Sequence, residues 1–228
     1  MIGKINKLNF KSLLILNTFA LIATSYFFNN LVFIGVYTLF FYISLLSTKS
    51  GLKISKKLNF LQNIRAEGPS NHFKKNDTPT MGGIFMMIPF LIFLLIININ
   101  LGSPKLILLL ITIFGFFITG FLDDFLSIKN KKNTGLKSKE KFALQSIISI
   151  IFIFFANEMD LINPLIMISD AWVINMNIFI WPISFIVLVG ISNAVNLTDG
   201  LDGLAAGCSG IVFYGLGTEI LMKEQQEL

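Results

Sequence analysis

The chain has 228 residues, of which 54% are hydrophobic and 14% are charged, and its formal net charge is +5. Its mean hydropathy of +0.74 excludes a soluble globular protein, because a soluble domain of this length cannot bury so much apolar surface. The apolar runs are continuous rather than alternating, so the composition predicts an all-α, polytopic helical membrane protein.

Seven apolar segments are candidate transmembrane helices, and together they predict a single membrane domain over residues 1–228. The segments are residues 12–28, 31–46, 82–100, 106–122, 142–156, 178–191 and 204–222. The first has no small-residue cleavage pattern, so it is predicted to be retained rather than removed as a signal peptide.

The basic residues indicate which side of the membrane each loop occupies. With alternating sides, sixteen of the eighteen Lys and Arg residues fall on one side, in the N-terminal tail and in predicted loops at residues 48–81 and 123–141. Positively charged loops stay in the cytoplasm, so this face is predicted to be cytoplasmic. Three polar segments, residues 78–83, 123–124 and 193–203, share this face and can therefore converge on one site.

Asp123 and Asp124 stand where the apolar run 106–122 meets a lysine-rich stretch. A carboxylate near a bilayer is costly, and two adjacent carboxylates repel each other unless a cation lies between them. The pair is therefore predicted to hold a divalent cation or to face a charged substrate. The alternative is a helix end whose acidic side chains lie in the headgroup water, and the pair alone does not decide between the two.

Four polar residues at a constant spacing of three form the most specific stretch of the chain. They are Asn193, Asn196, Asp199 and Asp202. On a helix, neighbours at this spacing can point into one cleft. Carboxylate and amide oxygens suit Mg²⁺ and can also hydrogen-bond a nucleotide, whereas the alternative is a polar loop with turn residues. The strict interval between two apolar spans favours a binding site.

Residues 78–83 open the third span, and helix capping alone can explain their Pro and Thr residues. Their functional interpretation is phosphate binding at a helix N-terminus, assisted by Lys74 and Lys75. Most of the lysines between Lys129 and Lys141 are predicted to bind anionic lipid headgroups. The single histidine, His72, is predicted to be a surface or structural residue.

Taken together, four motifs in this order resemble the polyprenyl-phosphate N-acetylhexosamine-1-phosphate transferases of glycosyltransferase family 4. They are Gly68-Pro69-Ser70-Asn71-His72, residues 75–83, Phe121-Leu122-Asp123-Asp124 and residues 193–205. The resemblance is greatest to the phospho-N-acetylmuramoyl-pentapeptide-transferase branch. It implies transfer of the phospho-sugar from UDP-MurNAc-pentapeptide to undecaprenyl phosphate with Mg²⁺, giving lipid I and UMP for peptidoglycan synthesis in the bacterial inner (plasma) membrane.

The resemblance also implies roles for individual residues. Asp123 and Asp124 would be the catalytic pair, one helping to hold Mg²⁺ and one taking the proton of the lipid phosphate, with Asn193 near the metal. The residues expected to face the nucleotide or its diphosphate are Lys75, Thr80, Asn196, Asp199 and Asp202. A homodimer is expected from the family, membrane lipid is an expected partner, and a nucleic-acid partner is not expected.

The resemblance ends near Met222, whereas family members continue with further motifs, among them a Met-Gly-Asp segment and a His-His-His loop. The expectation is therefore an N-terminal part of a longer fold, with little or no transferase activity by itself. The alternatives are a sister transferase that uses UDP-N-acetylglucosamine, an inactive fragment, and an ion-coupled transporter. Transporter acids tend to lie near mid-membrane in repeated patterns, which disfavours the last alternative.

Overall fold

The computed structural model describes residues 18–19, 31–61, 79–130, 135–169, 172–199 and 203–226. The chain divides into two compact units, one made of Met1–Ile43 with Ala206–Leu228 and the other of Ser44–Ala205. In the first unit, the described residues form the beginning of α2 (Leu31–Lys57) and most of α7 (Leu204–Gln226). Every residue predicted for the site falls in the second unit.

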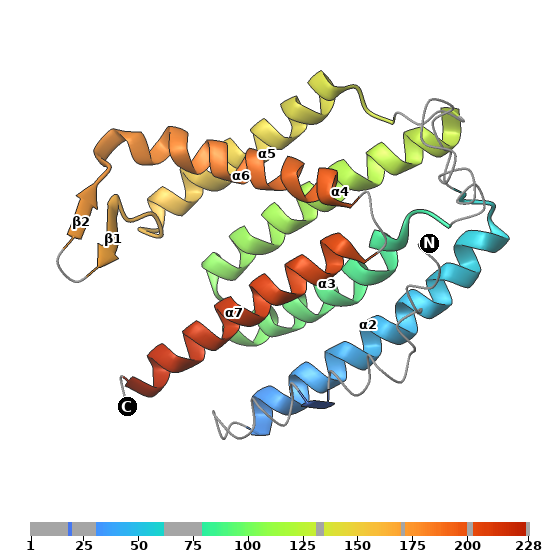
Figure 1. Ribbon diagram of the computed structural model, residues 1–228, viewed down its shortest axis with the longest axis horizontal. Coiled ribbons are helices and arrows are strands. Elements are labelled where there is room, and N and C mark those ends of the chain that lie inside the picture. The colour runs from blue at the N-terminus through green and yellow to red at the C-terminus, as the bar shows by residue number, and fades with distance from the viewer. Residues whose placement is uncertain are drawn as a thin grey trace, which may run out of the picture. The chain divides into compact units, whose positions relative to one another are not determined.

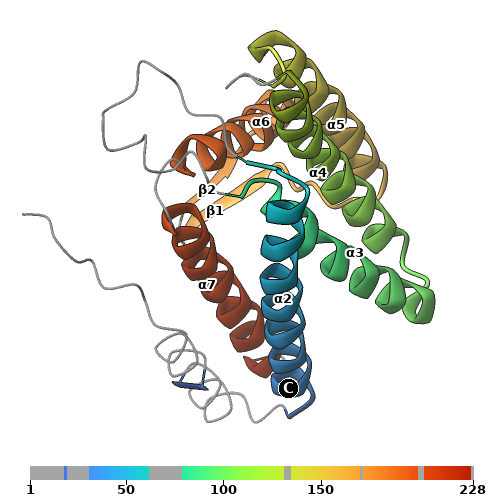
Figure 2. The ribbon, with the colours of Figure 1, turned by 90° about the vertical axis from the view of Figure 1, so that its right-hand side faces the viewer.

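The second unit is a series of helices in which each packs on the next along the chain. After the end of α2 come α3 (Gly82–Leu101), α4 (Pro104–Asn130), α5 (Ser138–Glu158), β1 (Leu165–Ser169), β2 (Trp172–Asn175), a short 3-10 turn η2 (Asn177–Phe179) and α6 (Ile180–Thr198). Helix α3 packs on α4, α4 on α5 and α5 on α6. Figure 1 shows that the beginnings of α3 and α5 lie on the same side as the ends of α4 and α6. The hairpin of β1 and β2 lies at the other end of α5 and α6. Figure 2 shows the same helices from the side.

The α3–α4 connection explains why two long apolar runs fold as separate helices. Gly102 follows α3 in the left-handed conformation (φ 59°), and its N–H donates to the carbonyl of Asn98 at 2.7 Å. Glycine adopts this conformation without a Cβ clash, and proline is favoured at the first position of a helix. Pro104 then opens α4, so the short turn reverses the chain.

Four described helices are long and apolar enough to cross a membrane, namely α3, α4, α5 and the segment Asn177–Thr198 that contains α6. Few of their apolar side chains are buried, as expected for helices that face lipid. The prediction of a helical polytopic membrane protein is therefore confirmed, whereas the count of seven spans is not. The predicted span 12–28 lies almost wholly outside the described residues, and the apolar part of α7, Leu204–Ile220, is shorter than the four.

The helices extend further than the apolar runs that predicted them. Helix α2 continues to Lys57 and α4 continues to Asn130, so the beginnings of both predicted loops, 48–81 and 123–141, are helical. Hydropathy marks where a helix leaves the membrane, and basic residues in a last turn stabilise the helix beyond that point through its dipole. Asp123 and Asp124 therefore lie within a helix and not at its end.

The segment between α5 and α6 contains an antiparallel hairpin that the all-α prediction did not include. Leu165 pairs with Asn175 and Ile166 with Ile174. Both strands are rich in β-branched and large apolar residues, which favour extended structure. The hairpin is a small addition to a helical fold.

Candidate functional site

The carboxylate of Asp123 on α4 is held by the segment that leads into α5. One oxygen, Oδ1, accepts the backbone N–H of Leu136 at 2.9 Å. The other, Oδ2, forms an ion pair with the Lys141 ammonium at 2.9 Å, with 16% of the Lys141 and 26% of the Asp123 side chain exposed. A Cβ at Gly135 would overlap the Asp123 backbone carbonyl, so glycine is needed there for this close approach.

Asp124 connects the three polar segments that the sequence placed on one face. Its half-buried carboxylate accepts the backbone N–H of Met81 and interacts electrostatically with Asp123, Lys141 and Asp199. Met81 precedes α3, Asp124 lies in α4, and Asp199 follows α6. The predicted convergence of residues 78–83, 123–124 and 193–203 is thus observed for Met81, Asp124 and Asp199, one residue of each segment.

The end of α2 contacts the start of α3 and holds it in place. The Ser47 hydroxyl donates to the carbonyl of Phe85 at 2.6 Å, and a Cβ at Gly51 would overlap the Phe85 ring. Met81, which is 3% exposed, has a left-handed backbone (φ 64°). A non-glycine residue in this region stores strain that only a well-fixed environment sustains. The packing therefore holds the Met81 N–H against Asp124.

Helices α5 and α6 meet through polar side chains, of which Gln145 is buried and Ser192 and Asn193 are half-buried. Gln145 is 1% exposed, and its Nε2 donates to the Ser192 hydroxyl at 3.0 Å. Asn193 Nδ2 donates to Gln145 Oε1 at 2.8 Å and to the carbonyl of Val189 at 2.8 Å. These bonds fix the rotation of α6 relative to α5 at the turn that carries Asn193.

The remaining predicted residues occupy different positions. Asn196 is exposed on α6, and Asp199 is exposed just beyond it, with its N–H donating to the carbonyl of Val195 at 3.1 Å. Thr80 is half-buried beside Met81, and its N–H donates to the carbonyl of Phe60 at 2.9 Å. Three predicted residues, Lys75, Asp202 and His72, lie outside the described residues.

The negative charges of the carboxylates in the site favour the binding of a cation. Among the described residues, Asp124 interacts with two further carboxylates, Asp123 and Asp199, and with the ammonium of Lys141, and both oxygens of Asp123 are already engaged. Within the described part of the chain, no three His, Cys, Asp or Glu side chains group closely enough to hold a metal ion. Asp124 and Asp199 offer carboxylate oxygens and Asn193 offers an amide oxygen, and oxygen ligands of these kinds suit Mg²⁺, which keeps several waters and binds substrate phosphates.

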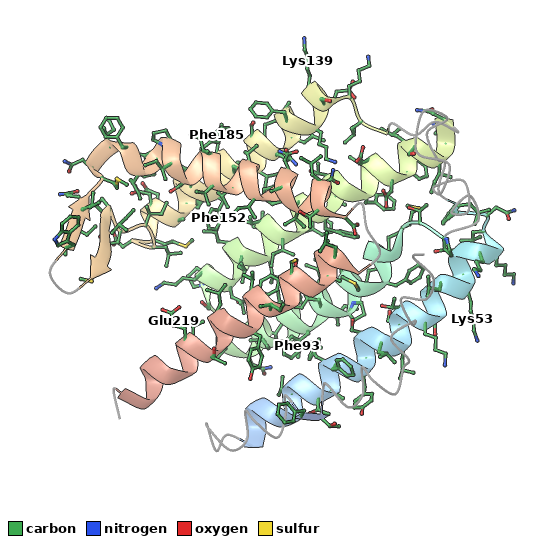
Figure 3. The ribbon with its side chains drawn as sticks, in the orientation of Figure 1. Lys53, Phe93, Lys139, Phe152, Phe185 and Glu219 are labelled. Atoms are coloured by element: carbon green, nitrogen blue, oxygen red, sulfur yellow. The ribbon has the colours of Figure 1, made fainter. Side chains whose placement is uncertain are left out.

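Sequence reasoning missed three residues that shape this site. Lys141 was assigned with the lipid-binding lysines, but its ammonium pairs with Asp123. Gln145 lies one helical turn further along the same face of α5, within an apolar run, and a polar amide in such a run was the available signal. Gly135 gave no signal of its own, since loop glycines are common. Figure 3 shows that Lys139, by contrast, projects from the first turn of α5 away from the neighbouring helices.

Comparison with known proteins identifies the family of the chain. Residues 106–228 match the family described as Glycosyl transferase family 4, and residues 75–85 match the Phospho-N-acetylmuramoyl-pentapeptide-transferase signature 1. A phospho-N-acetylmuramoyl-pentapeptide-transferase of Prochlorococcus marinus strain MIT 9312 is 83% identical over 228 residues, which are 100% of this chain and 64% of the relative. One of Halalkalibacterium halodurans is 38% identical over 175 residues, 76% of this chain and 54% of the relative. The chain thus spans less than two thirds of the length of these relatives.

Proposed function

Because the chain belongs to glycosyl transferase family 4, we propose that the complete protein transfers phospho-MurNAc-pentapeptide from UDP-MurNAc-pentapeptide to undecaprenyl phosphate, releasing UMP and forming lipid I. One observation carries the proposal. The carboxylate of Asp124 accepts the Met81 N–H and interacts electrostatically with Asp199, so three segments distant in the sequence come together around it. The signature match at residues 75–85 and the names of the relatives support phospho-N-acetylmuramoyl-pentapeptide as the transferred group.

The reaction requires a phosphate oxygen of the lipid carrier to attack the β-phosphorus of the nucleotide diphosphate. A bond forms between that oxygen and the β-phosphorus, and the bond from the β-phosphorus to the bridging oxygen breaks, so that UMP leaves with the electron pair. Both reactants are anionic, so the site must offset negative charge as the reaction proceeds. The three carboxylates cannot do this without a cation.

Asp124, Asp199 and the Asn193 oxygen would hold Mg²⁺ in this proposal. Bound there, the ion would supply positive charge against the diphosphate oxygens and the developing charge on UMP. Asp123 would stay fixed by Lys141 and Leu136, close to the lipid phosphate, and would receive its proton where that phosphate is still protonated. At neutral pH most of that phosphate is already deprotonated, so this proton transfer contributes modestly.

The substrate would be oriented by residues around the carboxylates. The residues proposed to face the nucleotide or its diphosphate are Lys75, Thr80, Asn196, Asp199 and Asp202. Lysine binds phosphate as a point charge, and backbone N–H groups at the start of a helix attract anions. We further propose that this face is cytoplasmic in the bacterial inner membrane, since the basic residues gather on it, and that the complete protein is a homodimer.

The test is formation of lipid I by the complete protein in detergent or liposomes. Radiolabelled UDP-MurNAc-pentapeptide, undecaprenyl phosphate and Mg²⁺ should give a labelled lipid product and UMP, and chelation of the divalent ion should stop the reaction. A parallel reaction with labelled UDP-N-acetylglucosamine should give no lipid product. A product from the second donor alone would instead support the sister transferase, and no product from either would overturn the proposal.

A further inference from the structure

Gln145 has no role in the proposed reaction, but it contacts a residue that does. It is almost fully buried, at 1% exposure, within a helix long and apolar enough to cross a membrane. Burying an amide in such a place is costly unless its hydrogen bonds are made. We infer that Gln145 is a positioning residue that fixes the carboxamide of Asn193 with its oxygen as the atom left to bind. This inference rests on the proposed function, in which Asn193 is a cation ligand.

The orientation of the Asn193 amide follows from the partners of its two donors. One N–H donates to the carbonyl of Val189 at 2.8 Å, and a backbone carbonyl can only accept. The other N–H donates to Gln145 Oε1 at 2.8 Å. An amide nitrogen has two N–H donors, so both are consumed inside the protein. Turning the amide over would bring the Asn193 oxygen against two acceptors.

The oxygen of Asn193 keeps most of its binding capacity. Among the described residues, its one contact with a donor is that with Gln145 Nε2 at 3.5 Å, which is longer than a typical N–H···O hydrogen bond. Gln145 Nε2 makes a shorter bond of 3.0 Å to the Ser192 hydroxyl. Ser192 therefore holds the Gln145 amide in place against α6, and Gln145 Oε1 occupies the second N–H of Asn193.

The consequence is chemical selectivity at this position. With its donors occupied, Asn193 can present only an acceptor, so it suits a cation, a cation-bound water or an N–H group. It does not suit a phosphate oxygen, which needs a donor. Residues that orient metal ligands in this way typically change metal affinity by about 10- to 100-fold when they are replaced.

The experiment measures Mn²⁺ binding to the complete protein without substrate, from the electron paramagnetic resonance signal of the free ion. Gln145→Met keeps the length of the side chain and removes the amide oxygen and the amide nitrogen. We expect it to raise the Mn²⁺ dissociation constant about 10- to 100-fold. In an Asn193→Ala background, which should itself weaken binding, the same change should have little further effect. This non-additivity shows that Gln145 acts through Asn193.

A matched control and a milder variant keep the test decisive. Ser149→Ala lies one turn away on the same buried face of α5 and should leave Mn²⁺ affinity unchanged. Should Gln145→Met fail to fold, Ser192→Ala removes only the bond that orients Gln145, and it should weaken Mn²⁺ binding a few-fold. The inference would be overturned if Gln145→Met changed the Mn²⁺ dissociation constant by the same factor with and without Asn193. It would also be overturned if neither Gln145→Met nor Ser192→Ala changed that constant. Failure of lipid I formation by the unmodified protein would instead overturn the proposed function, whatever the Mn²⁺ cycle shows.

Discussion

The α3–α4 contact and the α5–α6 contact solve the same packing problem in different ways. Between α3 and α4, only apolar side chains line an open pocket of about 420 Å³, among them Leu91, Leu95 and Phe114. Between α5 and α6, Gln145 and Asn193 are joined by hydrogen bonds. Apolar contacts in a bilayer have little hydrophobic driving force, since lipid is as apolar as leucine.

The difference concerns how accurately each helix is fixed. Apolar surfaces allow small rotations at low cost, whereas a hydrogen-bonded amide pair has one good geometry. In the proposed function the amide of Asn193 must point in one direction, and Asn193 lies on the helix that is held by hydrogen bonds. Substitutions at the polar end should therefore change activity, and substitutions between α3 and α4 should change stability.

The largest effect is expected from Asp124→Asn. The amide keeps the shape of the side chain and can still accept the Met81 N–H, but it removes the charge that faces Asp199. Lipid I formation should fall by about 10²- to 10⁴-fold. The melting temperature should stay constant or rise, because one of three mutually repelling carboxylates is gone. Activity is measured with labelled nucleotide donor and stability by thermal unfolding in detergent.

Asp123→Asn is the matched comparison for this variant. It removes the ion pair with Lys141, so it should lower the melting temperature as well as the activity. Lipid I formation that survives in both variants would remove the pair from the catalytic account.

Gly135→Ala should have the next largest effect. The added methyl group would overlap the backbone carbonyl of Asp123, and neither backbone can yield cheaply. The segment should shift, losing the Leu136 N–H bond and the Lys141 ion pair, with a stability loss of about 1–3 kcal/mol and lower lipid I formation. Gly120→Ala on α4 is the control, because nothing lies within 4 Å of its added Cβ. Equal behaviour of the two variants would contradict the close approach.

Leu108→Ala tests a buried apolar position of α4. Leu108 is 4% exposed on α4, and its loss should leave a cavity that costs about 1–3 kcal/mol of unfolding free energy. The cost is below that of a soluble core, because the transfer from water does not contribute in a bilayer. Specific activity of the folded protein should not change. The neighbouring Leu109→Ala, which is 42% exposed, should cost much less, and a loss of activity without a loss of stability would be contrary to expectation.

The sequence predicted that Asp124 and Asp199 belong to one site, but it did not predict the contact between Gln145 and Asn193. Counting lysines placed Asp124 and Asp199 on one membrane face, and the structure brings their carboxylates into electrostatic contact. That prediction required only the number of times that the chain crosses the membrane between the two residues. The Gln145–Asn193 pair could not be predicted, because it depends on how two helices are rotated against each other. The rotation of two helices against each other is set by side-chain packing, and the pattern of apolar residues in the sequence does not specify it.

The same limit explains Lys141 and Gly135. One lysine among six in residues 123–141 has a special role only because the segment folds back on α4, and local sequence does not specify that return. The hairpin of β1 and β2 was also absent from the prediction, because short apolar runs do not by themselves distinguish strand from loop.

The smallest effect is expected from Ser149→Ala, and it separates burial from function within one helix face. Ser149 is fully buried on α5, one turn beyond Gln145, and its hydroxyl has no hydrogen-bond partner among the described residues. A buried hydroxyl without a partner costs free energy, so its removal should raise the free energy of unfolding by roughly 0.5–1 kcal/mol or leave it unchanged. Thermal unfolding in detergent measures this change, and lipid I formation should stay constant. A clear loss of stability would mean that the hydroxyl is paired in the membrane, and the polar contact between α5 and α6 would then extend deeper than Gln145.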